Sequence, residues 1–237
     1  MLKYVHIKQR FDAVHMQDEV RRIEAELWKP HYNAKHYEGS WATLPLRSIN
    51  GSTDNHTSIQ ASSLQKNMAY MDTSFLDSCT YLQSVLTFFE CEKMSVRLMR
   101  LGPGAFIKEH TDHEMSFEDG EARFHIPVIT NDKVDFFIED EKIFMKEGEC
   151  WYLNLSLKHR VNNFGDTSRI HLVIDCKVNE WIKNLLSKDP EIKKEIFEKQ
   201  EEITYSADDK TKIIRQLRLM GTPVSNELAD KMETGNN

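Results

Sequence analysis

The chain has 237 residues, of which 40% are hydrophobic and 29% are charged, an ordinary composition for a globular protein. Its formal net charge of −7 argues against nucleic acid or an anionic membrane as the main partner. The N-terminus has no uninterrupted apolar segment typical of a signal peptide, and no window of about 20 apolar residues could span a bilayer. We therefore expect a cytoplasmic protein that binds neither nucleic acid nor membrane.

The N-terminal half is predicted to combine two helices with short strands. Asp12 is a suitable N-cap for a helix that runs to about Trp28, where Pro30 stops it. Thr73 or Ser74 is expected to begin a second helix that continues to about Phe89. Strands are expected at residues 2–7 and 44–48, and a polar surface loop at 51–63.

From Met94 onward, short runs of period-two alternation replace the helical pattern. The runs are MSVRLMRL, ARFHIPVI, VDFFI, ECWYLN and RIHLVIDC, and turn-forming residues separate them. Several close, short strands without helices between them predict an antiparallel sandwich or jelly-roll barrel. Two of these strands have one apolar face and one polar face, which carries Arg123 and His125 in the first and Arg169, His171 and Asp175 in the second. Alternation alone does not say whether the polar faces meet solvent or a ligand inside the barrel.

Beyond Trp181 the composition becomes highly charged with helical spacing. Lys188-Asp189-Pro190 resembles a linker, and Thr222-Pro223 predicts the start of a further short helix. We therefore predict two domains. Residues 1–181 would form the barrel with an N-terminal helical cover, and residues 182–237 a small C-terminal helical appendage.

The tripeptide His110-Thr111-Asp112, followed about fifty residues later by His159, is a candidate metal site. In a strand, residues two apart point to the same side, so His110 and Asp112 can reach one ion. Two histidines and a carboxylate form the facial set with which non-haem iron(II) oxygenases bind iron, leaving positions open. Because the chain contains ten histidines, such a pair alone also fits an ordinary surface or core arrangement.

Arg169 makes the metal interpretation more specific. A 2-oxoglutarate co-substrate chelates iron through its keto and C1 carboxylate oxygens, so its C5 carboxylate needs a charged partner with bidentate geometry. An arginine on the inner face of the last strand, shortly after His159, would meet that need. The competing interpretation of Arg169 is a surface salt bridge, for example to Asp166.

The segments LGPGAFIKEHTDHE, EARFHIPVITN and GECWYLNLSLKHRVNNFGDTSRIHLVIDC resemble the catalytic domain of the aspartyl/asparaginyl β-hydroxylase family, whose bacterial members include proline cis-hydroxylases. The resemblance is strong over residues 97–176 and weaker over 31–47. It implies a double-stranded β-helix, of the jelly-roll or cupin-like type. It also implies an iron(II)-dependent dioxygenase that decarboxylates 2-oxoglutarate to succinate while hydroxylating a C–H bond.

By position, the resemblance implies that His110 and His159 bind the iron, and that Asp112 is the carboxylate ligand of the bacterial amino-acid hydroxylases. The animal β-hydroxylase lacks a carboxylate there, so the ligand set varies within the family. Arg169 matches the arginine that holds the C5 carboxylate, and Arg123 and His125 match the pair that lines the co-substrate or substrate site.

For the substrate side we name His31, Trp41 and Arg47, with Arg47 as a candidate partner for a substrate carboxylate; a packed lid without ligand contact is the alternative. The expected substrate is a free or carrier-bound amino acid, and a homodimer is compatible with the sequence. Two other functions stay open. One is a cupin metalloenzyme that needs no keto acid, although a cupin motif expects His where Asp112 stands. The other is a non-catalytic β-barrel that binds a ligand.

Overall fold

The computed structural model describes residues 1–23, 27–54, 69–112, 115–187 and 207–234. The chain forms two compact units, Met1–Ile192 and Lys193–Asn237. The elements of the first unit, in chain order, are β1 (Tyr4–Arg10), α1 (Ala13–Arg21), β2 (Lys29–Pro30), the short 3₁₀ helix η2 (Ala34–His36), β3 (Tyr37–Glu38), β4 (Trp41–Ile49), β5 (Tyr70–Asp72), α2 (Ser74–Asp77), α3 (Thr80–Thr87), β6 (Lys93–Leu101), β7 (Phe106–His110), β8 (Glu121–Ile129), β9 (Val134–Ile138), β10 (Glu141–Ile143), β11 (Glu149–Leu153), β12 (His159–Asn163), β13 (Arg169–Lys177) and α4 (Glu180–Leu186).

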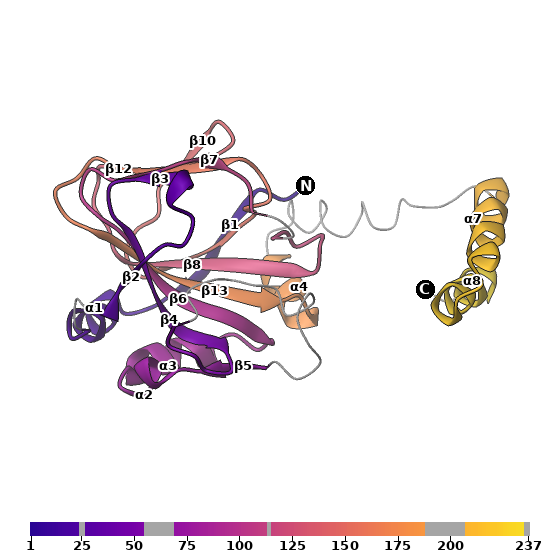
Figure 1. The fold of residues 1–237 in the computed structure, drawn as a ribbon, viewed down its shortest axis with the longest axis horizontal. Helices are drawn as coiled ribbons and strands as arrows, with labels where there is room; N and C mark the ends of the chain where they lie inside the picture. The colour runs from indigo at the N-terminus through magenta and orange to yellow at the C-terminus, as the bar shows by residue number, and fades with distance from the viewer. Residues whose placement is uncertain (24–26, 55–68, 113–114, 188–206, 235–237) are drawn as a thin grey trace. The chain divides into compact units, whose positions relative to one another are not determined.

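In the described residues these strands form two antiparallel sheets that face each other (Figure 1). The larger sheet has the order β1-β11-β8-β13-β6-β4-β2, with β5 paired to β4, and the smaller sheet has the order β10-β9-β12-β7-β3. From β6 to β13 the chain passes repeatedly between the two sheets, as a double-stranded β-helix requires. The predicted mainly-β jelly-roll with flanking helices is therefore confirmed, and all five period-two runs form strands.

Helices α1 to α4 lie on the side of the larger sheet that faces away from the smaller sheet (Figure 1). The apolar face of β8 points toward them, so that Phe124 packs against Phe89 with ring centroids 5.2 Å apart. Phe124, Ile126 and Val128 have no exposed surface. The polar face of β8, which carries Arg123 and His125, is thereby directed into the space between the sheets.

The second predicted helix is wrong as a single element, because it divides into α2 and α3. Thr73 precedes α2 as expected, but its hydroxyl donates to the carbonyl of Pro45 and does not accept from the N–H groups of the helix. The N-terminus of α3 is capped from another element: the Glu19 carboxylate of α1 accepts from the backbone N–H groups of Tyr81 and Leu82, at 2.7 and 2.9 Å. A buried carboxylate at these free N–H groups stabilises a new helix start.

Helix α1 begins as predicted but ends early. The Asp12 carboxylate accepts from the N–H groups of Val14 and His15, which confirms the N-cap. The helix ends at Arg21, where the following N–H groups bond three residues back in a tightened last turn. Trp28, the expected last residue, instead lies outside the helix with the Arg100 guanidinium 4.6 Å from its ring centroid.

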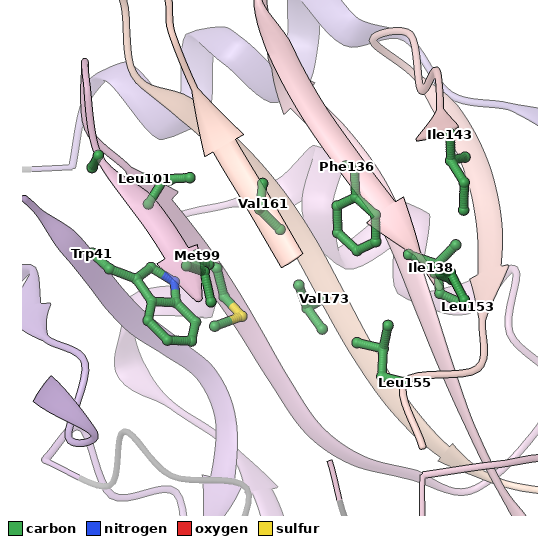
Figure 2. Close-up of a cluster of buried hydrophobic side chains, with 12 residues drawn as sticks. Trp41, Met99, Leu101, Phe136, Ile138, Ile143, Leu153, Leu155, Val161 and Val173 are labelled. Atoms are coloured by element: carbon green, nitrogen blue, oxygen red, sulfur yellow. The ribbon is translucent and has the colours of Figure 1, made fainter. Parts of the chain in front are cut away.

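A cluster of buried apolar side chains lies between the two sheets and joins residues from both (Figure 2). Trp41, Met99 and Leu101 come from the larger sheet, and Phe136 and Val161 from the smaller one. All five are at most 9% exposed. Close packing of this kind holds the facing strands in a fixed register.

The second unit contains α7 (Ala207–Met220) and α8 (Pro223–Thr234), which contact each other. Arg218 of α7 pairs with Asp230 and Glu233 of α8, with nitrogen–oxygen distances of 2.6 and 2.9 Å. The helix expected at Thr222-Pro223 is confirmed. The linker predicted at 188–190 and most of the polar loop at 51–63 lie outside the described residues, and the domain boundary after Trp181 stays a prediction. None of the described helices has the length and apolar character that crossing a membrane requires.

Candidate active site

Two strands of the smaller sheet and the loop after one of them bring the three candidate metal ligands together. His110, the last residue of β7, lies opposite His159, the first residue of β12, with ring centroids 4.2 Å apart. Asp112 lies beyond the end of β7, where its N–H donates to the carbonyl of Leu155. The strand therefore does not continue to Asp112 as predicted, yet one ligand atom from each of the three residues lies within 4.8 Å of the others.

The two histidines are oriented for metal binding by their own backbones. Nδ1 of His110 lies 2.8 Å from the carbonyl of Lys108, and Nδ1 of His159 lies 3.0 Å from that of Leu157. A carbonyl only accepts, so Nδ1 of each ring is the donor and Nε2 is the nitrogen available to a ligand. Burial lowers the pKa of His159 to about 4, which keeps it in the neutral, metal-binding form.

The candidate carboxylate ligand, Asp112, belongs to a buried ion network. One Asp112 oxygen lies 3.7 Å from Nε2 of His110, and the other accepts from Arg123. Arg123 also donates to Asp175, which accepts from Arg97 at 2.9 Å. Burial alone would raise the pKa of Asp112, but the Arg123 guanidinium and the two histidines bring it below its usual value. The donor set therefore fits a divalent iron, with Arg123 orienting the carboxylate.

All three ligands line a cavity of about 480 Å³ that also contains Arg169. The Arg169 side chain is 2% exposed, and no carboxylate among the described residues pairs with it, so the surface salt bridge to Asp166 does not form. Its Nε is buried without a hydrogen-bond partner in the described part of the chain, and burial lowers its pKa to about 9. A buried cation without a counter-charge favours an anionic ligand in the cavity.

Arg123 and His125 also line this cavity, but in different ways. The Arg123 guanidinium is bound by Asp112 and Asp175, so in this structure it orients a candidate metal ligand. His125 is 5% exposed, and its Nε2 is buried without a hydrogen-bond partner among the described residues. The assignment of both residues to the co-substrate stays a prediction.

The expected substrate side is formed by the segment before β4. His31 stacks on Trp41 with ring centroids 3.6 Å apart, and both residues line the cavity. His36, which the sequence did not single out, lies with its ring centroid 5.1 Å from that of His110. Burial lowers the pKa of His31 to about 3, so this wall of the cavity is neutral.

Arg47 does not line the cavity, so its expected contact with a substrate carboxylate is wrong. The register of β4 against β6 shifts by one residue between Pro45 and Arg47, so that Pro45 lies opposite Arg97 but Arg47 lies opposite Val96. A bulge of this kind turns the following side chain to the other face. The Arg47 guanidinium instead donates to Asp72 and to the carbonyls of Lys93 and Tyr70.

Arg97 takes the place in the cavity that was expected for Arg47. It is 3% exposed, lines the cavity and has a buried Nε without a described partner. The sequence contained a signal for it, because Arg97 alternates with Met99 and Leu101 on the inner face of β6.

A family model described as aspartyl/asparaginyl beta-hydroxylase matches residues 4–178, about three quarters of the chain. The chain belongs to the aspartyl/asparaginyl β-hydroxylase family. This family consists of hydroxylases that use iron(II) and 2-oxoglutarate. The L-proline cis-4-hydroxylase of Rhizobium meliloti (strain 1021) is 25% identical over 181 residues, which are 76% of this chain and 62% of that protein. The chain thus spans less than two thirds of this relative's length.

Solved structures of two hydroxylases are also similar to this member of the family. A prolyl-4-hydroxylase from Pseudomonas putida has a TM-score of 0.46 and 13% identity, covering 74% of this chain and 92% of its own. The viral collagen prolyl hydroxylase of Paramecium Bursaria Chlorella virus-1 has a TM-score of 0.43 and 9% identity, covering 75% and 97%.

Proposed function

We propose that this protein is an iron(II)/2-oxoglutarate-dependent dioxygenase that hydroxylates a C–H bond of an amino acid or amino-acid-like substrate. The observation that carries the proposal is Arg169, a buried arginine without a described counter-charge, in the same cavity as His110, Asp112 and His159. Membership of the hydroxylase family supports the same reaction.

In this proposal the chain's own residues bind and orient the reactants. His110, Asp112 and His159 would hold the iron, and Arg123 would keep the Asp112 carboxylate turned toward it. Arg169 would bind the C5 carboxylate of 2-oxoglutarate. An iron bound by these residues would supply the activation of O₂, through which conversion of 2-oxoglutarate to succinate and CO₂ would be coupled to insertion of one oxygen atom into the substrate.

A second buried arginine supports an amino acid as the substrate. Arg97 lines the cavity, and only one of its terminal nitrogens is bound by Asp175 in the described residues. We infer that Arg97 contacts the substrate carboxylate, while the stacked His31 and Trp41 form a neutral wall beside it. The activity in the name of the proline hydroxylase relative is compatible with this assignment.

The co-substrate assignment is tested by Arg169→Ala, with Arg100→Ala as the matched control. Arg100 lies on the same strand as Arg97, but its guanidinium contacts Trp28 outside the cavity. Succinate formation from 2-oxoglutarate is measured with iron(II), ascorbate and O₂. We expect Arg169→Ala to raise the KM for 2-oxoglutarate by about 30-fold or more, the equivalent of about 2 kcal/mol for a truncated buried charge contact. Unchanged turnover would show that Arg169 does not bind 2-oxoglutarate.

The metal assignment is tested by His110→Ala, which should abolish both iron binding and turnover. If activity is retained, the iron is bound elsewhere. A protein that binds iron but never consumes 2-oxoglutarate would fit the keto-acid-independent cupin enzyme or the non-catalytic binder.

The substrate class is tested by incubating the protein with free amino acids and short peptides and recording mass spectra. A gain of about 16 Da, the mass of one inserted oxygen atom, identifies a hydroxylated product. Reaction of only a protein-bound or carrier-bound amino acid would exclude a free amino acid as the substrate.

A further inference from the structure

A second cavity of about 460 Å³ shares a lining residue, Phe136, with the cavity of the proposed active site. Its lining combines apolar side chains of β9, β10 and the segment after β10, among them Val134, Ile143 and Met145, with polar ones that include Asn131, Lys146 and Glu147. Phe136 lines both cavities, and His171 lines only the second. Figure 2 shows Phe136 and Ile143 in the core between the sheets. Phe136 is thus part of the partition between the two cavities.

Arg169 lies against this partition. Its guanidinium carbon is 5.8 Å from the ring centroid of Phe136, and its Nη2 lies 2.8 Å from Nδ1 of His171. Arginine only donates, so Nδ1 of His171 is the acceptor and the imidazole holds one end of the guanidinium in place. His171 is 1% exposed and pairs in register with Met99 and Pro127 on the neighbouring strands, which fix its backbone.

No other hydrogen bond in the described residues holds the Arg169 guanidinium. Its Nε is buried without a partner among these residues, and its contact with Phe136 is a cation–π interaction. The position of the arginine along the barrel therefore depends on two side chains, His171 and Phe136. Both of them line the second cavity.

We propose that His171 and Phe136 determine the chain length of the keto acid that this protein uses as co-substrate. The hydrogen bond to His171 keeps the Arg169 guanidinium in the first cavity, and the Phe136 ring separates it from the second cavity. A keto acid that is one methylene longer than 2-oxoglutarate is excluded because its terminal carboxylate would have to push Arg169 into the partition. The inference rests on the proposed binding of 2-oxoglutarate at Arg169.

Smaller side chains in the partition should change this preference in a defined direction. One methylene more or less in a closed apolar site changes discrimination by about 10- to 200-fold. Opening the wall at Phe136 joins the second cavity to the first and gives Arg169 room to withdraw. The longer keto acid should then gain affinity relative to 2-oxoglutarate.

The experiment is a calorimetric titration of the 237-residue chain, loaded with Mn(II) as a redox-inert probe of the proposed iron site. The two titrants are 2-oxoglutarate and 2-oxoadipate, the homologue with one additional methylene. The wild type is compared with Phe136→Leu, with Phe136→Ala and with the control Phe137→Ala. Phe137 is the next residue of β9 but faces the other way, with the Arg160 guanidinium 4.1 Å from its ring centroid.

We expect Phe136→Leu and Phe136→Ala to shift the ratio of the two dissociation constants by at least about tenfold toward 2-oxoadipate, and Phe137→Ala to leave the ratio unchanged. Melting curves establish that each variant is folded, and Phe136→Leu retains most of the side-chain volume if Phe136→Ala does not fold.

His171 acts through Arg169, so it is a positioning residue. Its role is tested by one replacement that lacks a hydrogen-bond acceptor and one that retains an acceptor. His171→Ala should raise the KM for 2-oxoglutarate about tenfold with little change in kcat, and His171→Asn, whose amide oxygen can accept from Arg169, should restore most of the loss. A merely structural role would lower activity in both variants alike and would leave the KM unchanged.

The outcomes separate this inference from the function on which it rests. If the wild type gives no binding heat with 2-oxoglutarate, the proposed function fails. If the wild type binds 2-oxoglutarate and Arg169→Ala does not, but folded Phe136 variants keep the wild-type preference, only the partition is refuted. Equal effects of Phe136→Ala and Phe137→Ala would also overturn it.

Discussion

Asp175→Asn should both destabilise the protein and weaken its metal site. The Asp175 carboxylate is 1% exposed and accepts from Nη2 of Arg97 at 2.9 Å and from Nε and Nη2 of Arg123 at 2.6 and 3.0 Å. Both arginines are themselves at most 5% exposed. Asparagine keeps the shape of the side chain but removes its charge, so that Asp112 is the carboxylate that still pairs with one of these buried guanidinium groups among the described residues.

Breaking a buried ion pair from one side costs about 3–5 kcal/mol, because the remaining charge stays desolvated. We therefore expect the free energy of unfolding to fall by about that amount. Arg123 also orients Asp112, and loss of such a supporting contact lowers metal affinity by about 10- to 100-fold. Asp72→Asn is the matched control, because Asp72 pairs with Arg47 while 54% of its side chain is exposed. Asp72→Asn should lower the free energy of unfolding by less than about 1 kcal/mol.

Urea unfolding measures the stability change, and competitive titration with Mn(II) measures the metal affinity. A double-mutant cycle with Arg97→Met isolates the contact, and Arg97→Met should cost less in the Asp175→Asn protein than in the wild type. If Asp175→Asn changes stability by less than about 1 kcal/mol and leaves metal affinity unchanged, the network neither stabilises the barrel nor orients the ligand.

Two further predictions concern pH and helix capping. The pKa of His31 is lowered to about 3 by burial, below the unfolded value of 6.5, so the unfolded chain binds the extra proton first. Its contribution to stability is therefore complete above about pH 6.5 and is lost as the pH falls toward 3, by up to about 1.4 kcal/mol per pH unit. His31→Gln should flatten the pH dependence of the unfolding free energy in that window, and an unaltered slope would contradict the assignment. Glu19→Gln should lower the unfolding free energy by about 1–2 kcal/mol in urea titrations, because the carboxylate caps α3. The exposed Asp18→Asn on the same helix should leave stability nearly unchanged, and equal losses in both variants would exclude the cap.

Local sequence patterns were sufficient for the elements whose structure depends on near neighbours. Period-two alternation located five strands of the barrel, β6, β8, β9, β11 and β13, because side chains in a strand alternate whatever the strand pairs with. The same alternation separated Phe124 and Ile126 from Arg123 and His125 on opposite faces of β8. The Asp12 cap also follows from the sequence, since its partners are two and three residues away.

Features that depend on contacts between distant elements were decided only by the tertiary structure. The break between α2 and α3 follows from Glu19, some sixty residues earlier in the chain, and no pattern within the helix indicates it. The exchange of Arg47 for Arg97 in the cavity follows from a bulge in β4, because one inserted residue reverses which face each later side chain occupies.

The candidate metal site shows both contributions. The sequence supplied the identities of its members, because His110, Asp112, His159 and Arg169 have the donor types that iron and a keto acid require. Their convergence in one cavity required the pairing of β7 with β12 and the contact of Asp112 with Leu155. The contacts of Asp175 and His171 were decided only there, because the partners of a buried charge or imidazole are the groups that the fold places around it.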